Sequence, residues 1–186
     1  MEKTSFKSKN YHSEEVLELV YIDLCGSIGI ESYSGDNFFI PFVDDYSRMM
    51  TMLCLKEKYE AFQKFKWYLE RVEKETRKKL KHMRSNLGCE FISNGFDEFF
   101  IDKGIKRQVS AHVTPKQNGI EKRRNRSIMD CEKTLMIERN VAISTEVHTL
   151  NRGQLKKDPN QTLYEQWYGY KPNVITLKYL VANFIS

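Results

Sequence analysis

Short apolar runs alternate with polar turns in the first third of the chain. The runs occupy residues 17–26, 37–43 and 48–55, and glycine, serine or the paired aspartates 44–45 interrupt them. Apolar runs of this length joined by such turns are typical of an antiparallel meander. We therefore predict three antiparallel strands. Pro41 lies within the second, where it removes a backbone donor that an inner strand needs.

The apolar spacing changes to a helical period after residue 56. A helix is predicted over residues 57–77, with one apolar face made of Tyr59, Phe62, Phe65, Leu69 and Val72. The pattern continues with a strand at 79–84, a helix at 95–103, a strand at 105–110 and a helix from about 118 to 139. A small aromatic helix follows within residues 162–172. This order predicts an α/β domain in which a mixed sheet packs against helices.

Length, composition and charge limit the kinds of protein this chain can be, but they do not indicate a specific function. A chain of 186 residues with 40% apolar content can bury one substantial core. Its formal charge is +5, and basic residues cluster at 77–81 and 122–126. Such clusters are compatible with a nucleic-acid phosphate backbone, although a solvated helix face is the commoner explanation.

Other features of the sequence exclude several kinds of protein. No apolar run approaches the roughly 20 residues that span a bilayer, so a membrane protein is excluded. The four cysteines lack metal-site spacing, and the N-terminus has no apolar leader. We expect an intracellular protein, nuclear or cytoplasmic, with reduced thiols.

One acidic residue, Asp23, lies inside the otherwise apolar run 17–26. An ionised carboxylate in a low-dielectric setting is costly unless a cation or hydrogen bonds compensate it. The sequence therefore predicts that the strand either ends at Asp23 or presents this side chain to a cation.

Several motifs occur in a fixed order around this residue. Tyr21-Ile-Asp-Leu-Cys-Gly26 is followed by Phe39-Ile-Pro-Phe-Val-Asp-Asp-Tyr-Ser-Arg48, Leu55-Lys-Glu-Lys-Tyr-Glu-Ala-Phe62, Arg84-Ser-Asn-Leu-Gly-Cys-Glu-Phe91, Gly104-Ile-Lys-Arg-Gln108, the segment 114–126, Leu150-Asn-Arg152 and the segment 162–172. Over residues 17–172 the chain resembles the integrase catalytic core of copia-type LTR-retrotransposon Pol polyproteins. It resembles a degenerate copy of that core. That family belongs to the ribonuclease H-like superfamily.

The resemblance implies a fold and an ancestral chemistry. The implied fold is a ribonuclease H-like mixed five-stranded sheet, with three antiparallel strands and then parallel strands, flanked by helices. The implied activity is DNA integration by polynucleotidyl transfer with two Mg²⁺ or Mn²⁺ ions held by a D, D, E carboxylate triad. Anionic oxygen ligands are needed because the two cations repel each other at a separation of roughly 3.5–4 Å.

This chain departs from the triad at two of its three positions. Asp23 matches the first carboxylate, Asn86 stands at the second Asp position and Lys122 at the Glu position. The formal charge of the three positions therefore changes from −3 to 0, which disfavours binding of two divalent ions. Any metal binding through Asp23 should be weak or lost, and the chain should be catalytically inactive.

Two neighbouring acids could in principle replace the missing ligands. Glu121 precedes Lys122, but successive helical residues point about 100° apart, so it should face away from Asp23 unless the helix shifts by one residue. Glu90 follows Asn86, but the family also has a glutamate there, so we interpret it as inherited scaffold.

The resemblance also divides the chain and suggests partners. Residues 1–15 are expected to be a flexible lead-in that remains after a missing zinc-binding module, residues 16–140 the integrase core, and residues 141–186 its shortened C-terminal part. Non-specific DNA binding is expected through Lys79, Lys81, Lys116, Gln117, Asn118, Arg123, Arg124 and Arg126. The family also allows a homo-oligomer.

Three interpretations stay open from the sequence. The first is an inactive integrase core with residual DNA binding. The second is a weakly active, metal-dependent nuclease or strand transferase that uses Asp23 with Glu121 or Glu90. The third is the product of a pseudogene without a selected function.

Overall fold

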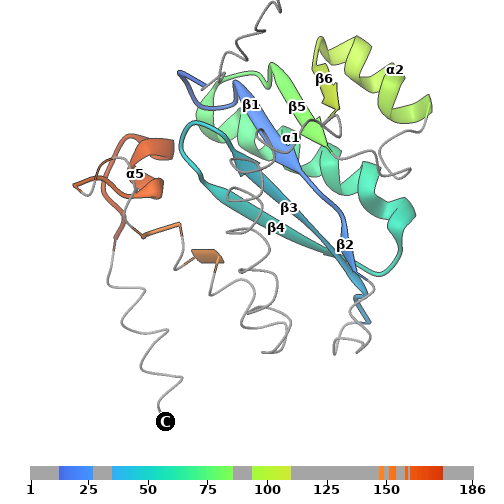
Figure 1. The fold of residues 1–186 in the computed structure, drawn as a ribbon, viewed down its shortest axis with the longest axis horizontal. Helices are drawn as coiled ribbons and strands as arrows, with labels where there is room; N and C mark the ends of the chain where they lie inside the picture. Colours follow the sequence, from blue (N-terminus) through green and yellow to red (C-terminus); the bar gives the residue numbers. More distant parts are fainter. Residues whose placement is uncertain are drawn as a thin grey trace, which may run out of the picture.

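In the computed structural model, the strands form one central sheet and helices lie against it (Figure 1). The structure describes residues 13–26, 35–85, 94–109, 147–148, 151–153, 158 and 160–173. The elements are β1 (Leu19–Ile22), β2 (Cys25–Gly26), β3 (Phe38–Asp44), β4 (Met50–Leu55), the 3₁₀ turn η1 (Lys58–Glu60), α1 (Ala61–Thr76), β5 (His82–Ser85), α2 (Asn94–Lys103), β6 (Lys106–Val109) and α5 (Leu163–Tyr168). The helix predicted at 118–139 lies outside the described residues.

The sheet is mixed, as the sequence predicted. β3 pairs antiparallel with β1, β2 and β4, whereas β1 pairs parallel with β5 and β5 pairs parallel with β6. This is the predicted sequence of three antiparallel strands followed by parallel ones. Within the described residues the sheet has six strands in place of the predicted five, because the first predicted strand is divided into β1 and β2 at Asp23 and Leu24.

Pro41 on the neighbouring strand explains this division. The register is the same on both sides of it, since Ile22 pairs with Phe42 and Cys25 with Phe39, so Asp23 falls opposite Pro41. The Asp45 N–H donates to the Leu19 carbonyl at 2.8 Å, and alternate residues of β3 direct their N–H groups to the same neighbour. Pro41 is therefore at a donor position toward Asp23 and has no hydrogen to donate. The ladder is interrupted there, although β3 itself continues as an inner strand.

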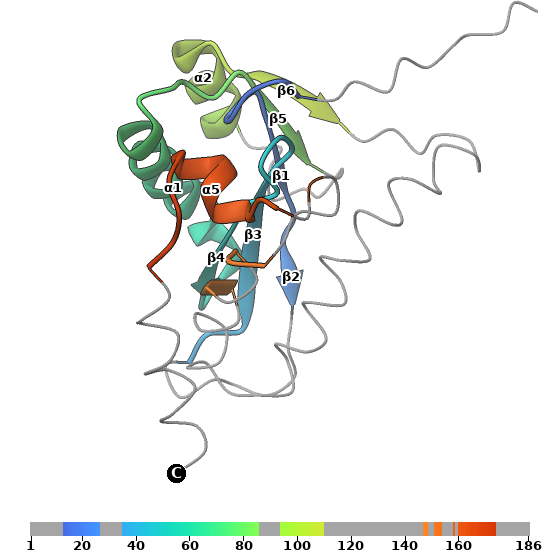
Figure 2. The same cartoon turned by 90° about the vertical axis from the view of Figure 1, so that its left-hand side faces the viewer.

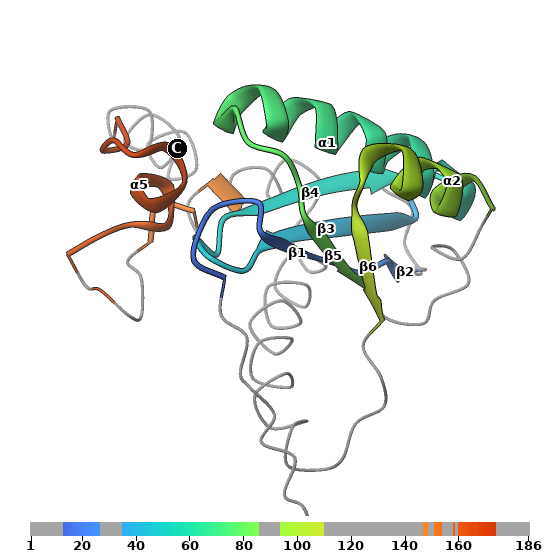
Figure 3. The same ribbon diagram turned by 90° about the horizontal axis from the view of Figure 1, so that it is seen from above.

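Helices α1 and α2 cover one face of the sheet (Figure 3). The core that they form with the sheet includes Val20, Ile22, Ile40, Phe42, Met83, Phe65, Tyr68, Leu69, Val72, Phe96 and Phe100. Tyr68 stacks on Phe42 with ring centroids 4.0 Å apart. The predicted apolar face of α1 was wrong at Tyr59, which is 81% exposed because it lies in η1, before the regular helix begins.

The opposite face of the sheet carries the alternate residues of the same strands. Leu19, Phe39 and Val43 are buried there. Near the start of β4, the Asn151 side chain forms two hydrogen bonds with the Met50 backbone, at 2.7 and 2.9 Å. Helix α5 follows this contact and lies near the β3–β4 turn and the C-terminal end of α1, where Tyr168 donates to Glu75 at 3.2 Å (Figure 2). The aromatic helix predicted within residues 162–172 is thus confirmed, and it ends at Gly169.

Candidate active site and nucleic-acid interface

Asp23 lies at the carboxyl end of β1, directly after Ile22. Since the register with β3 is unchanged across the interruption, Asp23 falls on the same sheet face as Tyr21 and Cys25, away from α1. Its side chain is half-buried, and its Oδ1 accepts the Leu24 N–H at 2.9 Å. The first of the two expected outcomes is therefore confirmed, because β1 ends directly before Asp23, and a backbone N–H meets the carboxylate there.

Parallel pairing brings a second segment to this edge of the sheet. Ile22 pairs with Ser85, and these two residues immediately precede Asp23 and Asn86 in the sequence. Asn86, Lys122, Glu121 and Glu90 themselves lie outside the described residues. Within the described ranges, no group of three histidine, cysteine, aspartate or glutamate side chains could hold a metal ion.

The paired acids of the β3–β4 turn have structural partners. Asp44 is fully buried and accepts hydrogen bonds from the Leu17 N–H, the Ser47 N–H and the Ser47 hydroxyl, at 2.8, 2.8 and 2.7 Å. Burial raises the pKa of Asp44, and these hydrogen bonds oppose the rise. Asp45 accepts the Ser13 N–H at 3.0 Å and pairs with Arg48 at 3.1 Å. The turn predicted here is confirmed, and both carboxylates belong to it.

Two of the lysines predicted to bind nucleic acid lie far from Asp23. Lys79 pairs with Glu73, and Lys81 with Glu15, each with N···O distances of 2.5 Å. The Lys81 N–H donates to the Leu17 carbonyl at 3.0 Å, at the amino end of β1. Asp23 lies four residues beyond Leu19, the first residue of β1, which is roughly 13 Å along the strand, and Leu17 lies further back still. The other predicted DNA-binding residues, from Lys116 to Arg126, lie outside the described residues.

Sequence reasoning missed a basic residue much nearer to Asp23. Arg84 on β5 pairs across the sheet with Tyr21 on β1 and with Gln108 on β6, and the three side chains are in contact. Arg84 opens the Arg-Ser-Asn motif, in which Asn86 is the residue that matches a family ligand position. No sequence pattern could have shown that Tyr21 and Gln108 flank it, because this depends on the register of three strands.

Each helix in the described ranges is too short or too polar to span a lipid bilayer.

Solved structures share this arrangement of strands and helices. One is the HTLV-2 integrase catalytic core domain in complex with magnesium, in a dimeric form, which aligns over 86% of this chain and all of that chain with a TM-score of 0.56 and 20% identity. A simian T-cell lymphotropic virus intasome in complex with the PP2A regulatory subunit B56 gamma aligns over 88% of this chain and 58% of that chain, with a TM-score of 0.63 and 13% identity. The fold is therefore that of the ribonuclease H-like integrase catalytic cores.

Sequence relatives give the family. The chain is 37% identical over 134 residues, 72% of its length, to the retrovirus-related Pol polyprotein from transposon TNT 1-94 of Nicotiana tabacum. It is 25% identical over 183 residues, 95% of its length, to the Pol polyprotein from transposon RE1 of Arabidopsis thaliana. No family model matches. The chain belongs to the family of retrovirus-related Pol polyproteins of plant transposons, in which it has the fold of an integrase catalytic core, and it spans about a tenth of the length of these relatives.

Proposed function

We propose that this integrase core has lost its catalytic metal site and retains non-specific binding to nucleic acid. The observation that carries the proposal is the setting of Asp23. It lies at the carboxyl end of β1, beside the end of β5, and is the only acid among the three residues that match the family triad. A single carboxylate cannot balance two divalent cations.

The donors present do not fit a pair of magnesium or manganese ions. Asp23, Asn86 and Lys122 offer one carboxylate, one neutral amide and one ammonium group. One carboxylate oxygen of Asp23 already accepts a backbone N–H. Asp44 and Asp45 are held by their own turn, so they supply no ligand in compensation. These residues therefore support no catalytic step through a metal ion in this chain.

Nucleic-acid binding is supported by charge and by the relatives. The chain carries a formal charge of +5, with Lys116, Arg123, Arg124 and Arg126 concentrated in one short segment. One neighbour in fold is described as part of an intasome. Contacts with phosphates through lysine and arginine are independent of sequence and weaken as salt rises. We propose the same kind of binding here.

A binding assay with two matched variants tests this function. A fluorescein-labelled DNA duplex is titrated with the protein at salt concentrations from 50 to 200 mM, and anisotropy is recorded. We expect a linear fall of log Kobs with log salt. The double variant Arg123→Glu/Arg124→Glu should bind more weakly with a shallower slope. Lys156→Glu/Lys157→Glu, with the same change of charge outside the predicted surface, should bind like the parent.

A nicking assay tests the loss of catalysis. The same duplex is incubated with Mg²⁺ or Mn²⁺, and we expect no cleavage above that of a heat-denatured sample. Metal-dependent cleavage that disappears in Asp23→Ala would contradict the proposal. It would favour a residual nuclease that uses Asp23 with Glu121 or Glu90.

Self-association forms part of the same proposal. HTLV-2 integrase cores have been solved in dimeric and trimeric forms. We propose a homo-oligomer for this chain as well. Light scattering coupled to gel filtration should give a mass above 22.1 kDa, and a mass equal to that of one chain would contradict it.

A further inference from the structure

Three directly opposed residues form a polar row across the sheet. Tyr21 on β1 pairs with Arg84 on β5, and Arg84 pairs with Gln108 on β6. The Gln108 Oε1 accepts from Arg84 Nε at 3.1 Å and from Arg84 Nη2 at 2.5 Å, and Arg84 Nη1 donates to the Tyr21 hydroxyl at 3.2 Å. The guanidinium also lies 5.3 Å from the centre of the Tyr21 ring. The Arg84 guanidinium is therefore held between a side chain of β6 and a side chain of β1.

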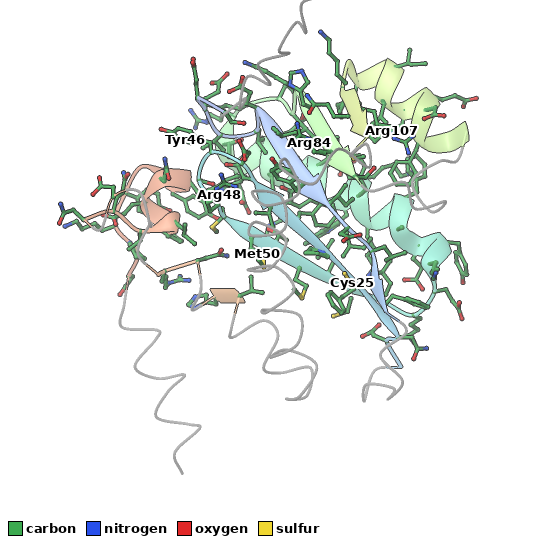
Figure 4. The ribbon with its side chains drawn as sticks, viewed as in Figure 1. Cys25, Tyr46, Arg48, Met50, Arg84 and Arg107 are labelled. Carbon is green, nitrogen blue, oxygen red and sulfur yellow. The ribbon has the colours of Figure 1, made fainter. Side chains whose placement is uncertain are left out.

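The partners of Arg84 are all neutral. In the part of the chain that the structure describes, no acidic side chain forms an ion pair with it. Arg107, one residue before Gln108, differs, because it lies on the other face of the sheet and pairs with Asp97 at 2.9 Å. Figure 4 labels Arg84 and Arg107, which lie on the neighbouring strands β5 and β6. A half-buried guanidinium with only an amide oxygen and a phenol as partners keeps its positive charge available to a further ligand.

The guanidinium also keeps donors for such a ligand. It has five N–H groups, and the contacts with Gln108 and Tyr21 use three of them, one on each nitrogen. One N–H therefore remains on each terminal nitrogen. Each of these two N–H groups can donate a charge-assisted hydrogen bond to a phosphate oxygen.

The position of the row relates it to the candidate site. Asp23 lies two residues beyond Tyr21 on the same sheet face, roughly 6.6 Å along the strand. A phosphate bound at Arg84 would therefore lie close to Asp23, the first position of the family's carboxylate triad. A phosphate bound at Lys79 or Lys81 would lie far from it.

We propose that Arg84, braced by Gln108 and Tyr21, is a phosphate-binding site that holds one phosphodiester of a bound nucleic-acid strand. This inference rests on the proposed nucleic-acid binding and assigns it a contact that needs no metal ion. Free phosphate offers the same oxygens, so it serves as the probe that separates the site from the larger function.

The salt dependence of binding tests the site with Arg107→Gln as the matched control. In Arg84→Gln, DNA binding should weaken alike for all sequences, and the slope of log Kobs against log salt should fall by about one. Arg107→Gln removes the same charge from the other face and should leave the slope unchanged. Arg84→Lys keeps the charge without the paired donors, so it should keep the slope and bind more weakly.

A second measurement keeps the site separate from the DNA-binding proposal. Inorganic phosphate is titrated into the ¹⁵N-labelled wild-type chain, and the Nε–H resonance of Arg84, assigned by its absence in Arg84→Lys, is followed. We expect this resonance to shift with saturation, while that of Arg107 does not.

The outcomes are distinct. If the wild type binds DNA and Arg84→Gln has the same slope and affinity, the Arg84 site is wrong and the general function stands. If the wild type fails to bind DNA, the proposed function is wrong, and the phosphate titration alone decides the site. If Arg84→Gln is unfolded by circular dichroism, Arg84→Lys and the titration of the wild type decide it. Absence of a phosphate-dependent shift at Arg84 then overturns the inference.

Discussion

The carboxylate of Asp44 accepts the backbone N–H of Leu17 at 2.8 Å, across 27 residues of sequence. Leu17 is fully buried and has a positive φ of 63°, a conformation that non-glycine residues rarely adopt. The bond therefore fixes the strained entry into β1 against the turn that ends β3. Through this contact, the Asp-Asp-Tyr-Ser-Arg motif helps to position the strand that carries Asp23.

We predict that Asp44→Ala lowers the free energy of unfolding by about 3 kcal/mol, because it leaves several buried donors without an acceptor. Asp44→Asn should lose less, since its amide oxygen can still accept one of these hydrogen bonds. Urea unfolding at neutral pH measures both. Asp102→Ala, at an exposed position of α2, is the control and should stay within about 0.5 kcal/mol of the wild type. Equal losses in Asp44→Ala and Asp102→Ala would contradict this role.

The stability of the fold should decline in acid through Glu15. Hydrogen bonds and charge attraction from Lys78 and Lys81 lower the pKa of Glu15 from 4.5 to about 2. Because the folded pKa is depressed, this contribution is present above pH 4.5 and is lost as the pH falls toward 2. The raised pKa of Asp44 affects stability in the opposite direction. The stability that it contributes is present below the ordinary pKa of 3.8 and is lost as the pH rises through the folded pKa.

Glu15→Gln isolates the first of these two effects. The difference in unfolding free energy between the wild type and Glu15→Gln should shrink steadily as urea titrations are moved from pH 6 to pH 2.5. Glu14→Gln, at an exposed neighbouring position, is the matched control, and the difference for Glu15→Gln should shrink more than the difference for Glu14→Gln. A constant difference for Glu15→Gln would show that the lysine contacts do not matter in solution.

The strands and helices of the described residues could be predicted because their apolar periods differ clearly. The error at Tyr59 came from applying a 3.6-residue period to a residue that precedes α1 and lies in a 3₁₀ turn. The break between β1 and β2 could not be predicted from residues 17–26. Its cause is Pro41, which lies opposite Asp23 only after the register of β3 is set.

The candidate site was less predictable than the fold for a related reason. Asp23 is visible in the sequence because it is a single acid in an apolar run. The surroundings of Arg84 depend on pairing between three strands that are distant in sequence. Basic clusters in the sequence pointed to Lys79 and Lys81, which the structure places at the other end of β1 from Asp23.

Helix α5 should depend on its N-terminal cap. Thr162 accepts the Glu165 N–H at 3.1 Å, and Glu165 accepts the Thr162 N–H at 2.8 Å. We predict that Thr162→Ala destabilises the protein by about 1 kcal/mol and exposes the buried Trp167. Acrylamide quenching in a Trp67→Phe background reports Trp167 alone, since the chain has two tryptophans. Thr162→Ser keeps the hydroxyl and should behave like the parent; increased quenching in it would contradict the cap.

Removing the charge of Asp23 should strengthen DNA binding in this chain. Without metal ions, its carboxylate repels a phosphate held nearby, so Asp23→Asn should lower the Kd for a DNA duplex measured in EDTA. Asp36 lies two residues before the start of β3, away from the β3–β4 turn. Asp36→Asn makes the same change of charge there and should have a smaller effect on the Kd. Weaker binding by Asp23→Asn, seen only when Mg²⁺ is present, would indicate a functional metal site.

Restoring the two lost charges should restore metal binding if the scaffold is intact. Ile22 and Ser85 are paired in register, so the backbone that leads to Asp23 and to position 86 has the arrangement that a shared site requires. We predict no Mn²⁺ binding by calorimetry for the wild type and measurable binding for Asn86→Asp/Lys122→Glu. The same double variant with Asp23→Ala is the control and should lose it. Binding by the wild type would contradict the proposed loss of the metal site, whereas absence of binding in the double variant would show that more than two ligands have been lost.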